Sequence, residues 1–300
     1  MGWKTVVIGA ECQVSLTLDR MRITMNDEYL NIPLTDINTV IFTHQKAVIT
    51  SSLIAALIEA NISIIICDNK NDPIGIFQSF NGHSLVFKQL NNQLNWKITR
   101  KKKLWKYIVE EKIQSEIECL NFLSPSKENI EVLKKYKSEV LNNDDTNREA
   151  ASAKVYFIAL FGKSFSREYN CAINAGLNYG YKIIASHISR CLASRGLITQ
   201  LGIHHKGEAN PFNLTYDFIE PFRYVVDMFV HEYINEKFGV KEKRMLIDLL
   251  QSKIFINNKW MRLVDASEDI LDSYIAFLNE SNDSILRINY SQGIKINGED

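Results

Sequence analysis

The chain has 300 residues with 35 basic and 35 acidic side chains, so it has no net charge at pH 7 and is long enough for two domains. Its 46% hydrophobic and 23% charged residues are typical of a folded globular protein, and no apolar run is long enough to span a bilayer. Without a secretion signal, and with five scattered cysteines that form no CxxC pair, the sequence argues against a disulfide or zinc framework and for a cytoplasmic protein.

Residues 1–82 have the patterns of β-strands. Val14 to Met25 alternates apolar and polar side chains on both sides of a predicted turn at Asp19-Arg20. Thr39 to Phe42 and Ile62 to Cys67 are apolar and rich in β-branched residues, which favours buried strands. Ser51 and Ser52 are suitable N-caps for a short apolar helix that would lie between these two strands in the sequence. We therefore predict a small N-terminal β domain with one packed helix.

From about Asn92 the apolar period becomes helical. We predict helices at Trp96 to Leu120, Ser126 to Leu141, Thr146 to Phe161, Tyr181 to Ser194, Asn213 to Tyr233, Lys241 to Ser252 and Glu268 to Asn279. The segment 83–96 is expected to be a linker and residues 97–300 a larger all-α domain, which gives an α+β fold overall. The tail from Ser284 to Asp300 is consistent with either a final strand or a partner-binding arm.

A basic segment opens the helical part. Pro73 to Val109 contains no Asp or Glu. Its candidate phosphate-binding residues are Lys97, Arg100, Lys101, Lys102, Lys103 and Lys106. Such a run is most often a solvated helix face, but it also suits a nucleic-acid surface whose affinity falls steeply with salt. The charge pattern alone leaves both interpretations open.

Imidazole and carboxylate groups come together near Asn213, where a helix is predicted to begin. Asp217 and Glu220 are three residues apart and would project from one side of that helix. His204 and His205 lie on the loop leading into it, and because they are adjacent, at most one is expected to be a primary ligand. Imidazole and carboxylate without thiolate suit Mg²⁺ or Mn²⁺, with zinc also possible. Asp217 fits three roles: a ligand, a group that orients a ligand, or a charge that complements the helix dipole.

Glu149 has two interpretations. Thr146-x-x-Glu149 before an apolar helix fits a capping box, in which the glutamate only satisfies a backbone N–H. Alternatively, Glu149 is a third metal ligand, delivered from a different helix than Glu220. A lost cap costs about 1 kcal/mol and leaves chemistry intact, whereas a lost ligand abolishes activity in a folded protein.

Ordered motifs in the helical part carry a family resemblance. They are Arg148 to Phe157, Asn174 to Tyr181, Gly202 to His205 and Asp217 to Arg223. Together with the β-then-α order of the chain, they resemble the CRISPR-associated integrase family Cas1. The last motif is most similar to type II systems, which are built around Cas9.

The resemblance implies that Glu149, His205 and Glu220 bind a catalytic Mg²⁺ or Mn²⁺, with Asp217 and His204 as auxiliary residues. It makes residues 97–300 the catalytic domain and implies a homodimer formed through the β domains. Two such dimers would be bridged by the small protein Cas2 into an integration complex in the prokaryotic cytoplasm. In a type II system, Cas9 and other adaptation proteins are further expected partners. The expected DNA substrates are a spacer precursor and the CRISPR repeat.

The implied reaction is direct transesterification, in which the 3′-hydroxyl of a short foreign DNA attacks the repeat boundary. With water as the nucleophile, the same site is an endonuclease.

Two alternative functions remain at this point. One is a stand-alone metal nuclease acting on branched or single-stranded DNA in repair, which would form no joined product when Cas2 and a repeat are supplied. The other is a catalytically silent DNA-binding scaffold, which has no need of three convergent ligands.

Overall fold

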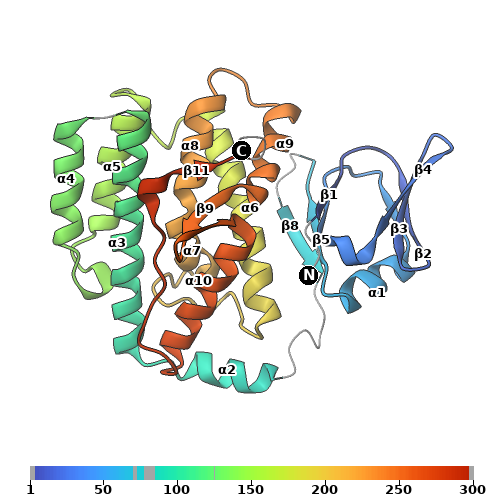
Figure 1. Ribbon diagram of the computed structural model, residues 1–300, viewed down its shortest axis with the longest axis horizontal. Coiled ribbons are helices and arrows are strands. Elements are labelled where there is room, and N and C mark those ends of the chain that lie inside the picture. Colours follow the sequence, from blue (N-terminus) through green and yellow to red (C-terminus); the bar gives the residue numbers. More distant parts are fainter. Residues whose placement is uncertain (1–3, 70–72, 78–84, 125, 297–300) are drawn as a thin grey trace. The chain divides into compact units, whose positions relative to one another are not determined.

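The computed structural model describes residues 4–69, 73–77, 85–124 and 126–296, and its contacts divide the chain into two compact units (Figure 1). The first unit is Met1–Phe87 with Ala193–Gly196, and the second is Lys88–Leu192 with Leu197–Asp300. The expected boundary after residue 82 lies outside the described residues. Helix α2 (Val86–Leu94) occupies much of the expected linker.

The first unit contains two four-stranded sheets and one α-helix, α1 (Ser51–Glu59), among its described residues. One sheet has the order β1-β5-β7-β8, with β1 (Lys4–Ile8), β5 (Ile37–Phe42) and β7 (Ser63–Cys67) parallel and β8 (Pro73–Phe77) antiparallel to β7. The other has the order β4-β3-β2-β6, with β4 (Glu28–Pro33), β3 (Arg20–Met25), β2 (Gln13–Thr17) and β6 (Val48–Ile49). A short 3-10 turn, η1 (Leu34–Asp36), precedes β5.

The strand predictions for this unit are confirmed, and one cap is corrected. β2 and β3 form the predicted antiparallel hairpin, in which Val14 pairs with Ile23. Helix α1 is capped by Thr50, whose hydroxyl accepts a hydrogen bond from Leu53 N at 3.4 Å, while Ser51 already lies inside the helix. Apolar residues of α1 and of both sheets, including Val14 and Leu53, form one buried core.

The predicted helices are all present in the second unit, except that the one expected over Asn213 to Tyr233 is divided into two α-helices by a 3-10 turn. Their observed bounds are α3 (Ile98–Leu123), α4 (Lys127–Ser138), α5 (Arg148–Phe161), α6 (Ala172–Ser194), α7 (Asn213–Ile219), α8 (Arg223–Tyr233), α9 (Val240–Asp248) and α10 (Leu263–Leu278). Four 3-10 turns accompany them: η2 (Asn142–Asp144), η3 (Glu220–Phe222), η4 (Leu249–Gln251) and η5 (Tyr290–Gln292). The helix predicted from Tyr181 begins earlier, at Ala172. The α+β class with a largely helical second part is confirmed.

A small sheet in the second unit corrects the expectation of an all-α region. Its order is β10-β9-β11, formed by β10 (Lys259–Arg262), β9 (Lys253–Ile256) and β11 (Ile294–Lys295). The β9–β10 turn uses Asn257 and Asn258 at positive φ, which asparagine tolerates better than most residues. The strands are too short to stand out as an alternating pattern. Within the predicted tail, β11 pairs with β9 as a final strand.

Helix α3 is the central scaffold of the second unit. It packs against α4, α5, α8 and α10 (Figure 1). Buried side chains occur around much of its circumference. On α6, a Cβ atom at Gly180 would lie 2.4 Å from Val226 Cγ1, and one at Gly176 would lie 2.6 Å from Ile234 Cδ1. These glycines therefore allow α6 to approach α8 closely. In the described part of the chain, no helix is both long and apolar enough to cross a membrane.

Candidate metal centre

Glu220 lies where the helix containing Asp217 changes its hydrogen-bonding pattern. It opens η3, and the next residue, Pro221, has no backbone N–H to continue an α-helical ladder. Its side chain is only 3% exposed; Oε1 lies 2.8 Å from Arg223 Nη2, and Oε2 lies 2.7 Å from Lys112 Nζ. Burial alone would raise the pKa of Glu220, but Arg223 and Lys112 together hold it below its ordinary value. The carboxylate is therefore ionised at neutral pH.

Glu149 lies in the first turn of α5, where the structure contradicts the capping-box interpretation. The N-cap residue is Asn147, in the left-handed region, rather than Thr146. Asp144 performs the capping, because its carboxylate accepts hydrogen bonds from Arg148 N at 2.8 Å and from Glu149 N at 2.9 Å. The Glu149 side chain instead places Oε1 2.7 Å from Lys112 Nζ. Two carboxylates from separate helical segments thus converge on one ammonium group.

Asp217 shapes the loop that carries the two histidines. Its carboxylate accepts hydrogen bonds from the backbone N–H groups of Ile203, His204 and His205 at 2.6, 3.1 and 3.0 Å. The loop passes so close that a Cβ atom at Gly202 would lie 2.4 Å from His205 O and 2.7 Å from Asp217 Oδ2. These contacts fit the orienting role among the three considered for Asp217.

The two histidines face different surroundings. His205 Nδ1 lies 2.7 Å from Asp217 Oδ1, and this hydrogen bond raises the pKa of His205 against the opposing effect of burial. Its Nε2 is then the ring nitrogen left for a ligand. His204 stacks on the buried Trp105, with ring centroids 4.2 Å apart and planes 6° from parallel, and burial lowers its pKa. His204 therefore has a packing role in this structure.

The residues present fit a hard dication. Glu149 and Glu220 supply two carboxylates around one position that a positive group, Lys112 Nζ, already occupies. His205 is near enough for both carboxylates to raise its pKa. Oxygen donors with one imidazole, and no thiolate, suit Mg²⁺ or Mn²⁺.

Three of the six basic candidates are already paired with acidic residues. Lys97 lies 2.9 Å from Glu280, Arg100 contacts Glu280 and Asp283, and Lys106 lies 3.6 Å from Glu110. Lys103 Nζ lies 5.7 Å from the centre of the Phe277 ring. Lys102 is exposed.

Lys101 differs because it belongs to the surroundings of the histidine loop. Its pKa is lowered first by burial and then by the charge of Lys206, and the charge of Asp217 opposes that effect. Lys206 and His205 line an open groove of about 520 Å³ between Gln200 and Asn213. The groove leads to the histidine side of the candidate centre.

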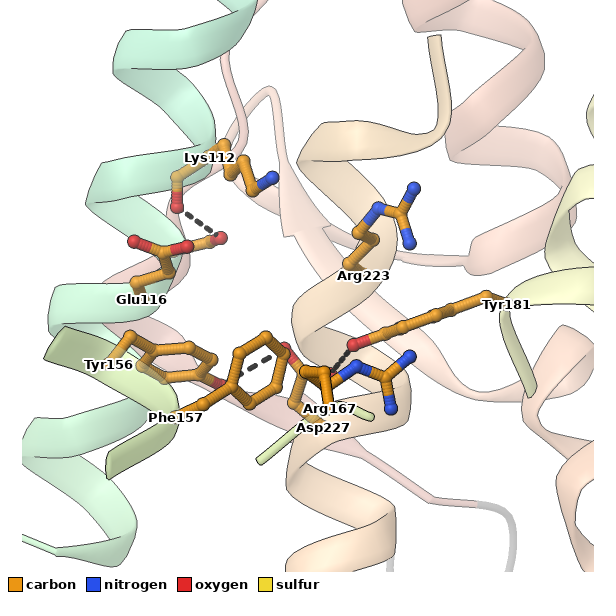
Figure 2. A pocket seen from close by; sticks show the side chains of 9 residues that line it. Lys112, Glu116, Tyr156, Phe157, Arg167, Tyr181, Arg223 and Asp227 are labelled. Carbon is orange, nitrogen blue, oxygen red and sulfur yellow. Dashed lines mark hydrogen bonds between the residues drawn. The ribbon is translucent and has the colours of Figure 1, made fainter. Parts of the chain in front are cut away.

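A smaller cavity of about 80 Å³ is lined by Lys112 and Arg223 among other residues (Figure 2). Asp227 on α8 accepts hydrogen bonds there from the hydroxyl groups of Tyr156 and Tyr181. Burial raises the pKa of Asp227 to about 6 despite these bonds, and it raises the pKa of Glu116 to about 8 against the opposing effect of Lys112. The ionised centre therefore borders a cavity in which burial raises the pKa values of both Asp227 and Glu116.

Sequence reasoning missed Lys112, Arg223 and Trp105 as parts of this centre. Lys112 and Glu116 are four residues apart and interrupt an otherwise apolar, buried face of α3, a pattern that could have drawn attention to them. The spacing of Arg223, three positions after Glu220, could have predicted an ion pair between the two side chains. Nothing in the sequence pointed to the stacking of Trp105 on His204.

Comparisons with known proteins identify the family to which the chain belongs. The family model described as "CRISPR associated protein Cas1" matches residues 5–257. A CRISPR-associated endonuclease Cas1 from Neisseria meningitidis serogroup C (strain 8013) is 33% identical over 299 residues, covering 96% of each chain.

Solved structures share the fold. A casposase bound to its integration product has a TM-score of 0.75 at 18% identity and covers 97% of this chain and 94% of its own. A Cas6-RT-Cas1–Cas2 complex has a TM-score of 0.74 at 18% identity and covers 95% of this chain and 36% of its own. With the family model spanning most of its length, the chain belongs to the Cas1 family and is a CRISPR-associated endonuclease and integrase of spacer integration.

Proposed function

We propose that this chain joins the 3′ ends of spacer precursors to the CRISPR repeat by metal-dependent transesterification, with Glu149, His205 and Glu220 as ligands of Mg²⁺ or Mn²⁺. The observation that supports this most directly is the convergence of Glu149 and Glu220 on one cation position, 2.7 Å from each. Those carboxylates come from separate segments, α5 and η3, so only the folded chain brings them together.

Each residue has a distinct role in this proposal. Asp217 accepts a hydrogen bond from His205 Nδ1, which leaves Nε2 as the nitrogen that would hold the metal. Arg223 holds the second oxygen of Glu220 and adds positive charge where the phosphate would approach. When bound, the dication would polarise the phosphoryl oxygen and help to deprotonate the attacking 3′-hydroxyl. The attack exchanges one phosphodiester for another, so no covalent enzyme intermediate is needed.

DNA would approach through the groove beside His205. Lys101 and Lys206 lie near this loop, whereas Lys97, Arg100 and Lys106 are occupied by acidic neighbours. We therefore assign the principal phosphate contacts to Lys101 and Lys206, with Lys102 and Lys103 as outlying contacts. A structural relative that contains Cas2 supports an assembly of homodimers bridged by Cas2. The similarity to the Neisseria protein is consistent with a type II system, in which Cas9 is a further partner.

The test is a strand-transfer assay with purified protein, a branched DNA that mimics a half-integrated spacer, and Mn²⁺ or Mg²⁺. Glu149→Gln keeps the size of the side chain but removes its charge, so we expect rejoining in a folded protein to fall by more than the ~10–100-fold that the loss of a ligand-orienting group causes. The matched control is Glu128→Gln, which changes an exposed glutamate in the first turn of α4. It should retain wild-type activity.

Circular dichroism establishes that both variants are folded. Full activity in Glu149→Gln, or wild-type activity that survives chelation of all divalent ions, would contradict the proposed metal centre. With Cas2 and a repeat supplied, the wild type should also form joined product, and cleavage alone would contradict the integration step.

A further inference from the structure

Lys112 occupies the position that the proposed dication would need. Its side chain is only 12% exposed, and Nζ lies 2.7 Å from Glu149 Oε1 and 2.7 Å from Glu220 Oε2. Magnesium binds carboxylate oxygens at about 2.0–2.1 Å, so an ion shared by these two oxygens would overlap the ammonium group. Lysine and metal therefore cannot hold the same pair of oxygens at once.

The charges of the cluster lead to the same conclusion. In the metal-free protein, Lys112 and Arg223 balance the negative charges of Glu149 and Glu220. A dication added to this balanced cluster would leave an excess of two positive charges in a buried site. Burying unpaired charge is costly, so the ammonium group needs a different acidic partner once a dication holds Glu149 and Glu220.

Glu116 offers the ammonium group a second partner. It lies four residues after Lys112 on α3, so the two side chains are neighbours on one helix face (Figure 2). Both line the cavity of about 80 Å³, and among the described residues Glu116 Oε2 is buried without a hydrogen-bond partner. Burial raises the pKa of Glu116 to about 8, so the carboxyl group is protonated near neutral pH, and an ammonium group that moves to Oε2 would take the place of that proton.

We propose that Lys112 is a tethered cation with two positions. In the metal-free protein it holds Glu149 and Glu220 together, and when the dication binds it moves to Glu116. This inference rests on the proposed metal centre. Lys112 is then a positioning residue, because it keeps the two carboxylates in place without metal and lowers the affinity for metal by competing with it.

The experiment measures Mn²⁺ binding to the full-length protein from the electron paramagnetic resonance signal of the free ion, together with the melting temperature in a chelator. Mn²⁺ is the probe because another group of donor atoms, His187, Cys191 and Glu268, includes a thiol, which favours Zn²⁺. The variants are Lys112→Met, Glu116→Gln and the double variant. Lys106→Met is the matched control, since it removes a more exposed lysine from the same helix.

Lys112→Met should melt at a lower temperature than wild type in chelator, because two buried carboxylates lose their shared cation. It should bind Mn²⁺ at least ~10-fold more tightly, because a competitor that occupies the site most of the time is gone. Glu116→Gln should bind Mn²⁺ at least ~3-fold more weakly, because it removes the second position of Lys112. In the double variant the effect of Glu116→Gln should vanish, and Lys106→Met should match the wild type.

Unchanged or weaker Mn²⁺ binding in Lys112→Met would overturn the inference. If Lys112→Met fails to fold, Glu116→Gln still tests the inference. Wild-type Mn²⁺ affinity in Glu116→Gln would show that Lys112 does not move to Glu116. Mn²⁺ binding to the wild type that Glu149→Gln does not weaken would instead refute the proposed metal centre. The two failures are therefore distinguishable.

Discussion

Asp217 acts on its neighbours through backbone and imidazole groups. Three consecutive N–H groups and His205 Nδ1 all lie within hydrogen-bonding distance of its two carboxylate oxygens. The side chain is fully buried, so no water can replace a missing acceptor without a rearrangement of the loop. The position and tautomer of His205 consequently depend on a residue that the proposed metal does not need to touch.

Asp217→Asn should reduce strand transfer by about 10–100-fold, the usual effect of removing a group that orients a metal ligand. It should also lower the pKa of His205 in metal-free protein, which histidine NMR measures directly, because the Asp217 hydrogen bond is the main cause of its raised value.

The same variant should change how stability depends on pH. A raised pKa stabilises the fold fully below the ordinary value of 6.5, and this stabilisation is lost as pH rises through the higher folded value. The wild type should therefore lose more of its free energy of unfolding between pH 6 and pH 8.5 than Asp217→Asn, as urea titrations would show. An unchanged histidine pKa in the variant would contradict the orienting role.

The candidates chosen from the sequence include the acidic residues that converge in the structure, but the basic residue between them was not predicted. Glu149, His205 and Glu220 belong to motifs that can be read along the chain, and Asp217 was among the candidates. Lys112 was missed because its role depends on α3 packing against both α5 and η3, which no local pattern encodes. The competing cap for Glu149 was also undecidable from sequence, since Asp144 caps the helix through a turn with two residues at positive φ, Asn143 and Asp144.

At the scale of elements, the start of α5 separates structural and functional carboxylates. Asp144 satisfies two backbone N–H groups of the first turn, whereas Glu149 points to Lys112. A carboxylate that caps a helix contributes stability without touching substrate. The two acidic residues should therefore respond differently to substitution.

Asp144→Ala should lower the free energy of unfolding by about 1–2 kcal/mol, because two N–H groups lose their acceptor. Thr146→Ala is the matched control and should leave stability nearly unchanged, since Thr146 is not the cap. Urea unfolding of both variants measures the difference. A larger loss in Thr146→Ala than in Asp144→Ala would restore the capping-box interpretation.

The long elements were predictable, and the short ones were not. Helices such as α3 repeat their apolar period over several turns, so their existence and approximate position follow from the sequence. The β9–β10 hairpin has four residues in each strand, too few for an alternating pattern to be distinguished from chance. The early start of α6 was missed because Asn174, Gly176 and Gly180 weaken the helical pattern, although the glycines are required by close packing against α8.

At the scale of the whole molecule, a protein without net charge must bind DNA through the local distribution of its charges. The basic run at the start of α3 is partly neutralised by acidic residues that are distant in sequence, including Glu280 and Asp283. Lys101 and Lys206, by contrast, repel one another near the histidine loop. Placing a phosphate between like charges relieves that repulsion, so these two lysines should contribute more to DNA binding than the paired ones.

This difference predicts a distinct salt dependence for each lysine. Removing one lysine that binds a phosphate should reduce the slope of log K against log salt by about 0.9, because one fewer counterion is released. We expect that change for Lys101→Gln and for Lys206→Gln, and a much smaller change for Lys97→Gln, whose partner is Glu280. Fluorescence anisotropy of a labelled branched DNA, with Glu149→Gln as the common background to prevent turnover, measures all three slopes. Equal slopes for Lys97→Gln and Lys101→Gln would show that DNA follows the whole basic run, with the ion pairs opening on binding.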